Sequence, residues 1–461
     1  MTVSKRRRGK QWRAEHTNSA LNFMAQFFQS FRLLVTWGCL LAMVLLPKTL
    51  QAQAGLNNSL MGQSVAAARD AQMQSQDYTF KYGDFRTLIT PSFAAQWNDN
   101  VRLTKTDMWD DYIMDPSVRI ASSYPLTQRN ILSLDVSVGY RRYLNHAELS
   151  TFDLNSSTGT GLSFDIGIKD FTFNFHDWFK YTQDASQNAT VANSGNYGTF
   201  QNTAGLSSTW DLNQVTLTAG YDHQNVISTS GQYNNLNHSA EMFFLRSGLQ
   251  VHPQVNVGLE TTASYTRYSQ TGTRNAANGL NDNDAYTVGP YVTFTPGSAL
   301  QITARGGYSI YQFQQSSLAM QTSDQNSWYA GLTVTHDLFD SVSYALDAGH
   351  ETTLGTQTDL TEDWYFRPNI TWKFIRDLTF NTGFSYQHGK QGQGGSMLAG
   401  SPLNNYLGEK YDWYGMTFQA AHPLTSRLNL ALNYRLTIRS SDRQNNNYTQ
   451  NMVGLELSYH H

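Results

Sequence analysis

An alternation of apolar and polar residues, sustained over 10 to 14 positions at a time, constrains this chain more than any other feature. Between residues 131 and 144, Leu132, Leu134 and Val136 share one face, whereas Ser133 and Asp135 share the other. The stretches 255–268, 299–312 and 428–438 repeat the pattern. A period of two is typical of strands with one apolar and one polar face. From about residue 85 onward, the sequence therefore predicts an all-β protein.

Short turns separate alternate strands at intervals of roughly 37 to 47 residues, which indicates a repeated hairpin unit. The turns are centred near residues 126, 169, 212, 253, 297, 340, 376 and 424. The other connections are longer and rich in Asn, Gln, Ser, Thr and Gly, as at 182–198, 269–284 and 387–409. Eight short turns that alternate with nine long loops predict 18 strands, with both ends of the chain on the short-turn side.

The length of the strands favours a membrane barrel over a soluble sandwich or propeller. Soluble strands usually have about 5–6 residues, whereas a tilted strand needs about 9–11 residues to cross a bilayer. Mid-strand charges are expensive in a packed core but suit a wet lumen. Trp210 and Trp372 lie near short turns, while Tyr221, Tyr265 and Trp413 lie near long loops, as expected of two interfacial girdles. We expect a transmembrane antiparallel up-and-down β-barrel of about 18 strands, with short periplasmic turns and long extracellular loops.

Composition excludes two other classes of protein. Only 15% of the residues are charged, against about a quarter in an average soluble protein. The 13% of aromatic residues argue against a disordered chain. Apart from one early stretch, no apolar run approaches the ~20 residues that a membrane-spanning helix requires.

The first 54 residues have the pattern of a secretory signal peptide. A basic start is followed by an apolar run from Leu33 to Leu46, and the segment ends in a small-x-small cleavage signal at Ala52–Ala54. The basic region is unusually long, so translation from Met24 is an alternative. We therefore expect a signal peptide at 1–54 that is cleaved near Ala54, a periplasmic N-terminal segment at 55–84, and an outer-membrane barrel at 85–461.

The sequence of the mature chain argues against nucleic-acid binding, metal binding and catalysis. The whole chain has 32 Lys and Arg against 35 Asp and Glu, and removal of the leader's 8 and 1 leaves 24 against 34, a formal net charge of −10. Such a balance disfavours nucleic acids. The only cysteine, Cys39, lies in the leader, and the histidines show no metal-site spacing. We expect no cofactor, no metal site and no enzyme activity; His176, on a predicted lumen face, is the one histidine of interest.

Several short segments resemble a family of outer-membrane β-barrel porins related to barrels associated with exopolysaccharide export, of the Verrucomicrobia type. The segments are Ile89–Phe93 with Trp97–Val101, Gly139-Tyr140, Phe173–Asp177, Trp210–Asn213, Gly220–His223 and Tyr448–Asn451. The resemblance covers nearly all of residues 80–459 and concerns strand and turn geometry rather than chemistry. It implies a porin-like barrel in the outer membrane of a Gram-negative bacterium.

The polar face of the strands is the predicted functional surface, because an 18-strand barrel is wide enough for an aqueous channel. We predict that it is a channel for passive passage of hydrophilic solutes, among them saccharides or exopolysaccharide. The predicted pore-lining residues, all charged and all on polar faces, are Asp135, Arg141, Glu260, Arg305, Asp347 and Arg435. The alternative is a structural or adhesive barrel with a closed lumen, acting through its extracellular loops.

The expected partners follow from a location in the outer membrane. They are outer-membrane lipid and lipopolysaccharide, saccharides, and the barrel assembly machinery. The alternation of Val453, Leu455, Leu457 and Tyr459 with small and polar residues resembles the closing strand that this machinery reads, although two histidines follow the aromatic residue.

Overall fold

The computed structural model describes residues 78–154, 161–269, 280–314, 323–356, 358–375, 377–392 and 408–459. These residues form one antiparallel sheet of twenty strands with short 3₁₀ turns in its connections. The predicted signal peptide, residues 1–54, and most of the predicted segment 55–84 lie outside the described residues. No helix among the described residues is long and apolar enough to cross a membrane.

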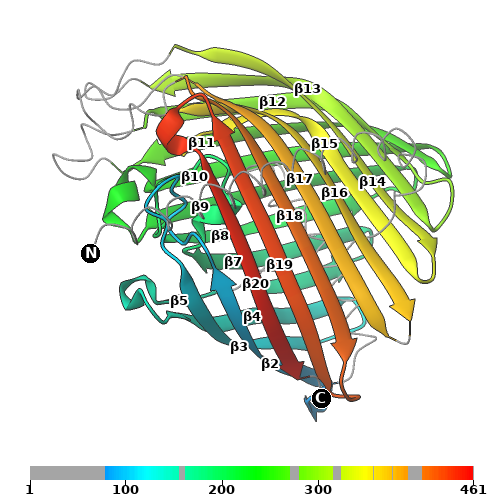
Figure 1. Cartoon of the computed structure of the whole chain (residues 1–461). Helices are drawn as coiled ribbons and strands as arrows, with labels where there is room; N and C mark the ends of the chain where they lie inside the picture. Colours follow the sequence, from blue (N-terminus) through cyan, green and yellow to red (C-terminus); the bar gives the residue numbers. More distant parts are fainter. Residues whose placement is uncertain are drawn as a thin grey trace, which may run out of the picture. The chain divides into compact units, whose positions relative to one another are not determined.

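The strands follow the chain in order around the sheet (Figure 1). Their bounds are β1 Phe80–Tyr82, β2 Phe85–Asn98, β3 Asp111–Pro125, β4 Asn130–Tyr143, β5 Thr151–Asp153, β6 Gly161–Ile168, β7 Phe171–Thr182, β8 Thr199–Asp211, β9 Val215–Ser228, β10 His238–His252, β11 Val255–Tyr268, β12 Asp282–Phe294, β13 Leu300–Gln314, β14 Gln325–Phe339, β15 Val342–Leu354, β16 Leu360–Ile375, β17 Leu378–Gln391, β18 Lys410–Pro423, β19 Leu428–Ser441 and β20 Tyr448–Tyr459.

The first and last long strands pair and close the sheet into a barrel. β2 pairs with β20 from Ser92↔Ser458 to Asn98↔Met452, while β2 also pairs with β3 and β20 with β19. β1 is a short extension that pairs only with the start of β2. β5 and β6 occupy one position in the barrel, because both pair with β4. The closed barrel therefore has the predicted 18 strands, and closure removes the exposed sheet edges.

An insertion interrupts that shared position. Asp135 of β4 pairs with Gly161, and Gly139 pairs with Asp153, so an advance of four residues along β4 corresponds to eight along its partner. The two pairings therefore differ in register, and the ladder beside β4 is interrupted between β5 and β6. Periodicity could not locate it, because Thr151–Asp153 is too short to show an alternation.

The eight short connections fall where the sequence predicted them, between β3 and β4, β6 and β7, and so on to β18 and β19. Three of them contain a residue with positive φ: Lys169 (54°), Asn213 (66°) and Asp377 (70°). A two-residue hairpin needs this left-handed backbone to match the twist of its strands, and Asn and Asp adopt it more readily than other non-glycine residues. The described parts of the longer connections join the opposite ends of the strands.

The two faces of the sheet differ as predicted. Leu132, Val138 and Tyr140 of β4 are exposed on the outer face, whereas Ser133 and Asp135 are buried on the inner face. The prediction of one residue in the interfacial girdle is wrong. Trp413 lies in the inward set of β18, because it pairs with Arg439 and its ring packs over the Cα of the inward-facing Gly415. The position in the alternation, rather than the residue type, decides which face a side chain occupies.

Candidate pore constriction

The connection between β7 and β8, residues 183–198, leaves the wall and crosses the lumen. Its residues Ala185, Val191 and Ala192 are almost fully buried. They could not be buried in a loop that projects into solvent. The long polar loop that the sequence predicted at 182–198 is confirmed, but the alternation pattern did not predict that it folds inward. Asn, Ser and Gly make this loop polar on average, but its few apolar residues are still buried away from water.

Contacts on distant parts of the wall show how far this loop reaches. The Asn193 amide donates to the backbone carbonyl of Asn445, in the connection before β20, at 3.1 Å. The Thr190 hydroxyl lies 3.0 Å from the hydroxyl of Thr356, in the connection between β15 and β16. Because strands follow chain order, β15 and β16 lie on the far side of the barrel from β7 and β8. The segment 183–198, hereafter the constriction loop, therefore spans the lumen.

Arg435 of β19 fixes the start of the constriction loop. Its Nη2 donates to Asp184 Oδ2 at 2.9 Å and to Ser186 Oγ at 2.7 Å. Burial raises the pKa of the Asp184 carboxyl, but the positive charges of Arg435 and Arg141 outweigh burial and hold this pKa well below its ordinary value. Asp184 also caps the short 3₁₀ turn Ala185–Gln187 by accepting from the Ser186 amide. The carboxylate is therefore ionised, and it ties the loop to β19.

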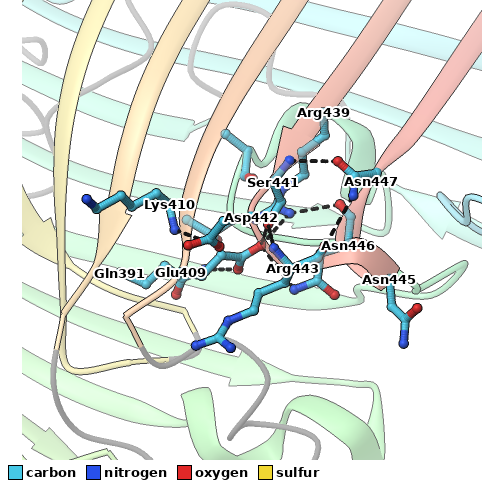
Figure 2. Close-up of polar contacts among 12 residues, drawn as sticks. Gln391, Glu409, Lys410, Arg439, Ser441, Asp442, Arg443, Asn445, Asn446 and Asn447 are labelled. Atoms are coloured by element: carbon cyan, nitrogen blue, oxygen red, sulfur yellow. Dashed lines mark hydrogen bonds and ion pairs between the residues drawn. The ribbon is translucent and has the colours of Figure 1, made fainter.

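A second arginine, Arg439, holds the middle of the loop from the same strand and the same face. Its Nε donates to the Ala189 carbonyl at 2.8 Å, and its Nη1 lies 2.7 Å from Glu409 Oε1. Figure 2 shows that Ser441, Asn446 and Gln391 surround the Glu409 carboxylate. Both charged side chains are 0% exposed. A buried ion pair is tolerable only when hydrogen bonds satisfy both partners, and this shell of donors supplies most of them.

An apolar cluster packs around the loop at the extracellular end. It joins Val191 and Ala192 to Leu103, to Tyr233 of the turn Gly231–Leu236, and to Leu280 before β12. These residues come from four different connections. Burial of apolar surface provides a non-directional attraction between them. The cluster therefore holds the loops together above the polar lumen.

The family comparison agrees with this architecture. Residues 80–461 match the model of a family described as "Putative beta-barrel porin 2". The chain belongs to this porin family. It is thus a porin-type barrel of the bacterial outer membrane. No curated protein matches the chain.

Solved porin structures align with the structure of this porin at low sequence identity. OccK2 (OpdF) of Pseudomonas aeruginosa, in complex with glucuronate, has a TM-score of 0.47 and 11% identity over 84% of this chain and 100% of that chain. A BenF-like porin from Pseudomonas fluorescens Pf-5 has a TM-score of 0.45 and 10% identity over 82% and 99%. OccAB3 of Acinetobacter baumannii has a TM-score of 0.41 and 11% identity over 81% and 99%.

Two of the six predicted pore-lining residues of this porin belong to the constriction. Arg435 holds Asp184 directly. Arg141 lies close enough for its charge to act on Asp184, and it pairs with Asp153 at 2.8 Å and with Asp115 at 3.4 Å. The structure therefore brings together two arginines that are 294 positions apart in the chain.

The other four lie on the wall away from the loop. Asp135 accepts two hydrogen bonds from Arg119 on β3, at 2.9 and 2.7 Å. Glu260 is buried beside the Tyr329 hydroxyl, at 3.4 Å. Asp347 lies 3.7 Å from Arg367. Arg305, on β13, lies against Gly331 of β14. All four share the inward face of their strands with polar neighbours, but the structure does not place them around one narrow point.

His176 is buried in a polar network of the wall rather than presented to the lumen. Its Nε2 lies 2.9 Å from Asp222 Oδ1 on β9, and its Nδ1 lies 2.8 Å from Asn174 Oδ1. β8 separates the two strands, and contact is possible because Gly205 lies between them. A Cβ at Gly205 would lie 2.0 Å from Asp222 Oδ1. The network thus links β7 to β9 across β8.

Our sequence analysis did not identify Asp184, Glu409 or Arg439 as site residues. The alternation could have identified Arg439, because this residue follows Arg435 by four positions and therefore lies on the same face of the strand. Asp184 and Glu409 lie in or beside long loops, where alternation says nothing about position. Among the described residues, no group of three or more His, Cys, Asp or Glu side chains is placed to hold a metal ion.

Proposed function

We propose that this porin is a passive channel for small hydrophilic solutes and that the constriction loop sets its effective width. The observation that carries the proposal is the loop's path across the lumen, held from one side by Arg435 and Arg439 and from the other by Thr356. A purely structural barrel has no need of a polar loop anchored inside its lumen.

The charges beside the loop support selection by polarity as well as by size. Asp115, Asp153 and Asp184 face Arg141 and Arg435, so both signs occur at one level. Opposed charges at close quarters sort solutes by the field across the pore. Among saccharides, we favour small sugars over exopolysaccharide, because a polymer would have to displace an anchored loop.

The remaining parts of the proposal concern export and surroundings. We propose that a signal peptide cleaved near Ala54 directs export, and that the assembly machinery reads the final strand, Tyr448–Tyr459. The exposed apolar outer face, which includes Phe93, Leu245 and Leu455, would contact outer-membrane lipid and lipopolysaccharide. The proposed function involves no chemical reaction.

The deciding experiment is single-channel conductance of residues 55–461 in a planar bilayer. We expect stable, salt-dependent steps in conductance. Alanine substitution of all six predicted pore-lining charges should change permeability or ion selectivity, with a variant altered only on the outer face, Leu245→Ala, as control. Unchanged permeability in the sixfold variant would refute the assignment of the lumen charges.

A structural or adhesive barrel with a closed lumen is the second candidate. The apolar cluster at the extracellular end favours it, because packed apolar side chains exclude water and ions. Folded protein without conductance would support this reading. Deletion of 393–407, in the connection between β17 and β18, should then abolish surface binding while the barrel remains folded.

A further inference from the structure

Two lysines lie directly opposite each other on the outer face of β17 and β18, close to the ends that the longer connections join. Lys390 of β17 pairs with Lys410 of β18, and both are exposed. Their neighbours Gln391 and Tyr411 are buried on the inner face. Side chains opposite each other in an antiparallel pair have Cβ atoms about 4.5–5.5 Å apart, and like charges at this spacing are destabilising. An anion between the two ammonium groups would remove this repulsion.

The carboxylates nearest to the two lysines on the outer face contact other groups. Glu362 of β16 is directly opposite Lys390, but its Oε1 lies 3.1 Å from His350 Nε2. Asp412 of β18 accepts a hydrogen bond from the Tyr386 hydroxyl at 2.8 Å. Within the part of the chain that the structure describes, neither lysine forms an ion pair.

The connections around the two lysines do not supply a counter-ion either. Residues 392–408, which connect β17 to β18, contain no Asp or Glu. Asp442 accepts from the backbone amide of Lys410 at 3.2 Å. Figure 2 shows that the Lys410 side chain extends away from Asp442 and from the buried Glu409. Both ammonium groups are therefore available to an external anion.

The outer face below the lysines is aromatic and then apolar. Trp364 is half exposed and pairs with His388, two residues before Lys390, which is roughly 7 Å along a strand. Further toward the short turns, Phe384 and Met416 pair directly and are exposed on the same face. Tryptophan and tyrosine mark the membrane interface, and exposed apolar residues mark the lipid core. The lysines therefore lie at the level of the lipid headgroups.

This order of residues indicates the chemistry of the ligand. Lysine binds phosphate as a compact positive charge. A soluble anion would gain only the contacts with the ammonium groups, whereas a lipid would also cover the apolar surface of Phe384 and Met416. Lipid A, the membrane anchor of lipopolysaccharide, joins phosphate groups to acyl chains. It is the outer-leaflet component that matches both parts of the surface.

We propose that Lys390 and Lys410 bind a phosphate group of lipid A while its acyl chains lie along Phe384 and Met416. The proposal rests on the proposed contact of the outer face with lipopolysaccharide, and it names the group that binds and the residues that hold it. It requires no open lumen, because both lysines are on the outer face.

The test measures binding of radiolabelled, diphosphorylated lipid A to the immobilised, detergent-solubilised protein (residues 55–461) in the presence of EDTA. Because EDTA removes divalent cations, the assay detects direct contacts of phosphate with ammonium groups rather than metal bridges to carboxylates. We expect binding of lipid A, and about 10-fold weaker binding of its dephosphorylated form. Inorganic phosphate at the concentration of the lipid should not displace it.

Three double variants identify the residues that bind. Lys390→Gln with Lys410→Gln should weaken binding of lipid A about 10-fold, as expected for the loss of charged hydrogen bonds at an exposed site. Lys390→Arg with Lys410→Arg should retain binding, because it keeps both charges. Lys105→Gln with Lys169→Gln is the matched control, because it removes the same charge from exposed positions in two other connections. Mobility on heat-modifiable gels verifies that each variant is folded.

The outcomes separate this site from the channel function. Binding that falls in the glutamine variant but stays in the arginine variant and the control supports the site. Equal binding in all variants, equal binding of dephosphorylated lipid A, displacement by inorganic phosphate, or loss of binding in EDTA overturns it. Wild-type protein that binds lipid A but does not conduct refutes the channel and leaves the site. Wild-type protein that conducts but does not bind lipid A refutes the site alone.

Discussion

Replacement of Arg435 by methionine should release the constriction loop without unfolding the barrel. Arg435 donates to Asp184 and to Ser186, while methionine keeps an unbranched side chain but donates nothing. Hydrogen bonds to charged groups contribute about 1.5–3 kcal/mol each. The Arg435 and Asp184 side chains are 22% and 16% exposed, so solvent screens part of the attraction. We expect a total loss of about 2–3 kcal/mol, which raises the open population of the loop about 30- to 140-fold.

Proteinase K digestion of the folded, detergent-solubilised protein measures this population. When opening is fast relative to cleavage, the cleavage rate follows the equilibrium fraction of the open loop. Cleavage within 183–198 should accelerate by that factor, and single-channel conductance should rise or become noisier. Arg119→Met is the matched control, because Arg119 forms an inward ion pair with Asp135 that does not touch the loop. A cleavage rate within twofold of the wild type, or an equal rise in the control, would refute the anchoring role.

Three further predictions test other parts of the structure. The pKa of Asp184 is lowered in the folded protein, so its stabilising effect is complete above its unfolded pKa of about 3.9 and is lost only as the pH falls through the lower folded value; conductance should therefore not change between pH 7 and pH 5 through this group. Gly205→Ala places a methyl group 2.0 Å from Asp222 Oδ1 and should reduce the yield of refolded barrel on heat-modifiable gels, whereas Gly231→Ala, where a Cβ meets nothing within 4 Å, should not. Arg439→Met should destabilise the loop end by about 3–5 kcal/mol, because it leaves Glu409 buried and unpaired; Arg439→Met combined with Glu409→Gln should recover most of this loss in hydrogen-exchange protection of the loop end.

Alternation determined most of the fold because the barrel repeats one physical rule. Each spanning strand must present apolar residues to lipid and polar residues to the lumen. A local alternation with a period of two residues therefore predicts the fold of the whole barrel. The predicted run 255–268 coincides with β11, and 428–438 lies within β19. The short turns could also be predicted from the sequence, because a tight hairpin requires particular residues at its centre.

Alternation failed where a residue type suggested one face and its position dictated the other. Trp413 was expected in the girdle because tryptophan favours the membrane interface, but its odd position on β18 places it inward beside Arg439. Asp282 and Asp284, which looked like part of a long loop, lie in β12, where Asp284 pairs with Arg267 at 2.7 Å. Loop boundaries drawn from polarity alone are therefore shifted by several residues.

The sequence by itself determined the strand count, the topology and which face of each strand is apolar, because these depend on neighbours in the chain. Only the tertiary structure decided where the channel narrows. The contact between Asp184 and Arg435 joins residues 251 positions apart, and no local pattern records that a polar loop turns inward.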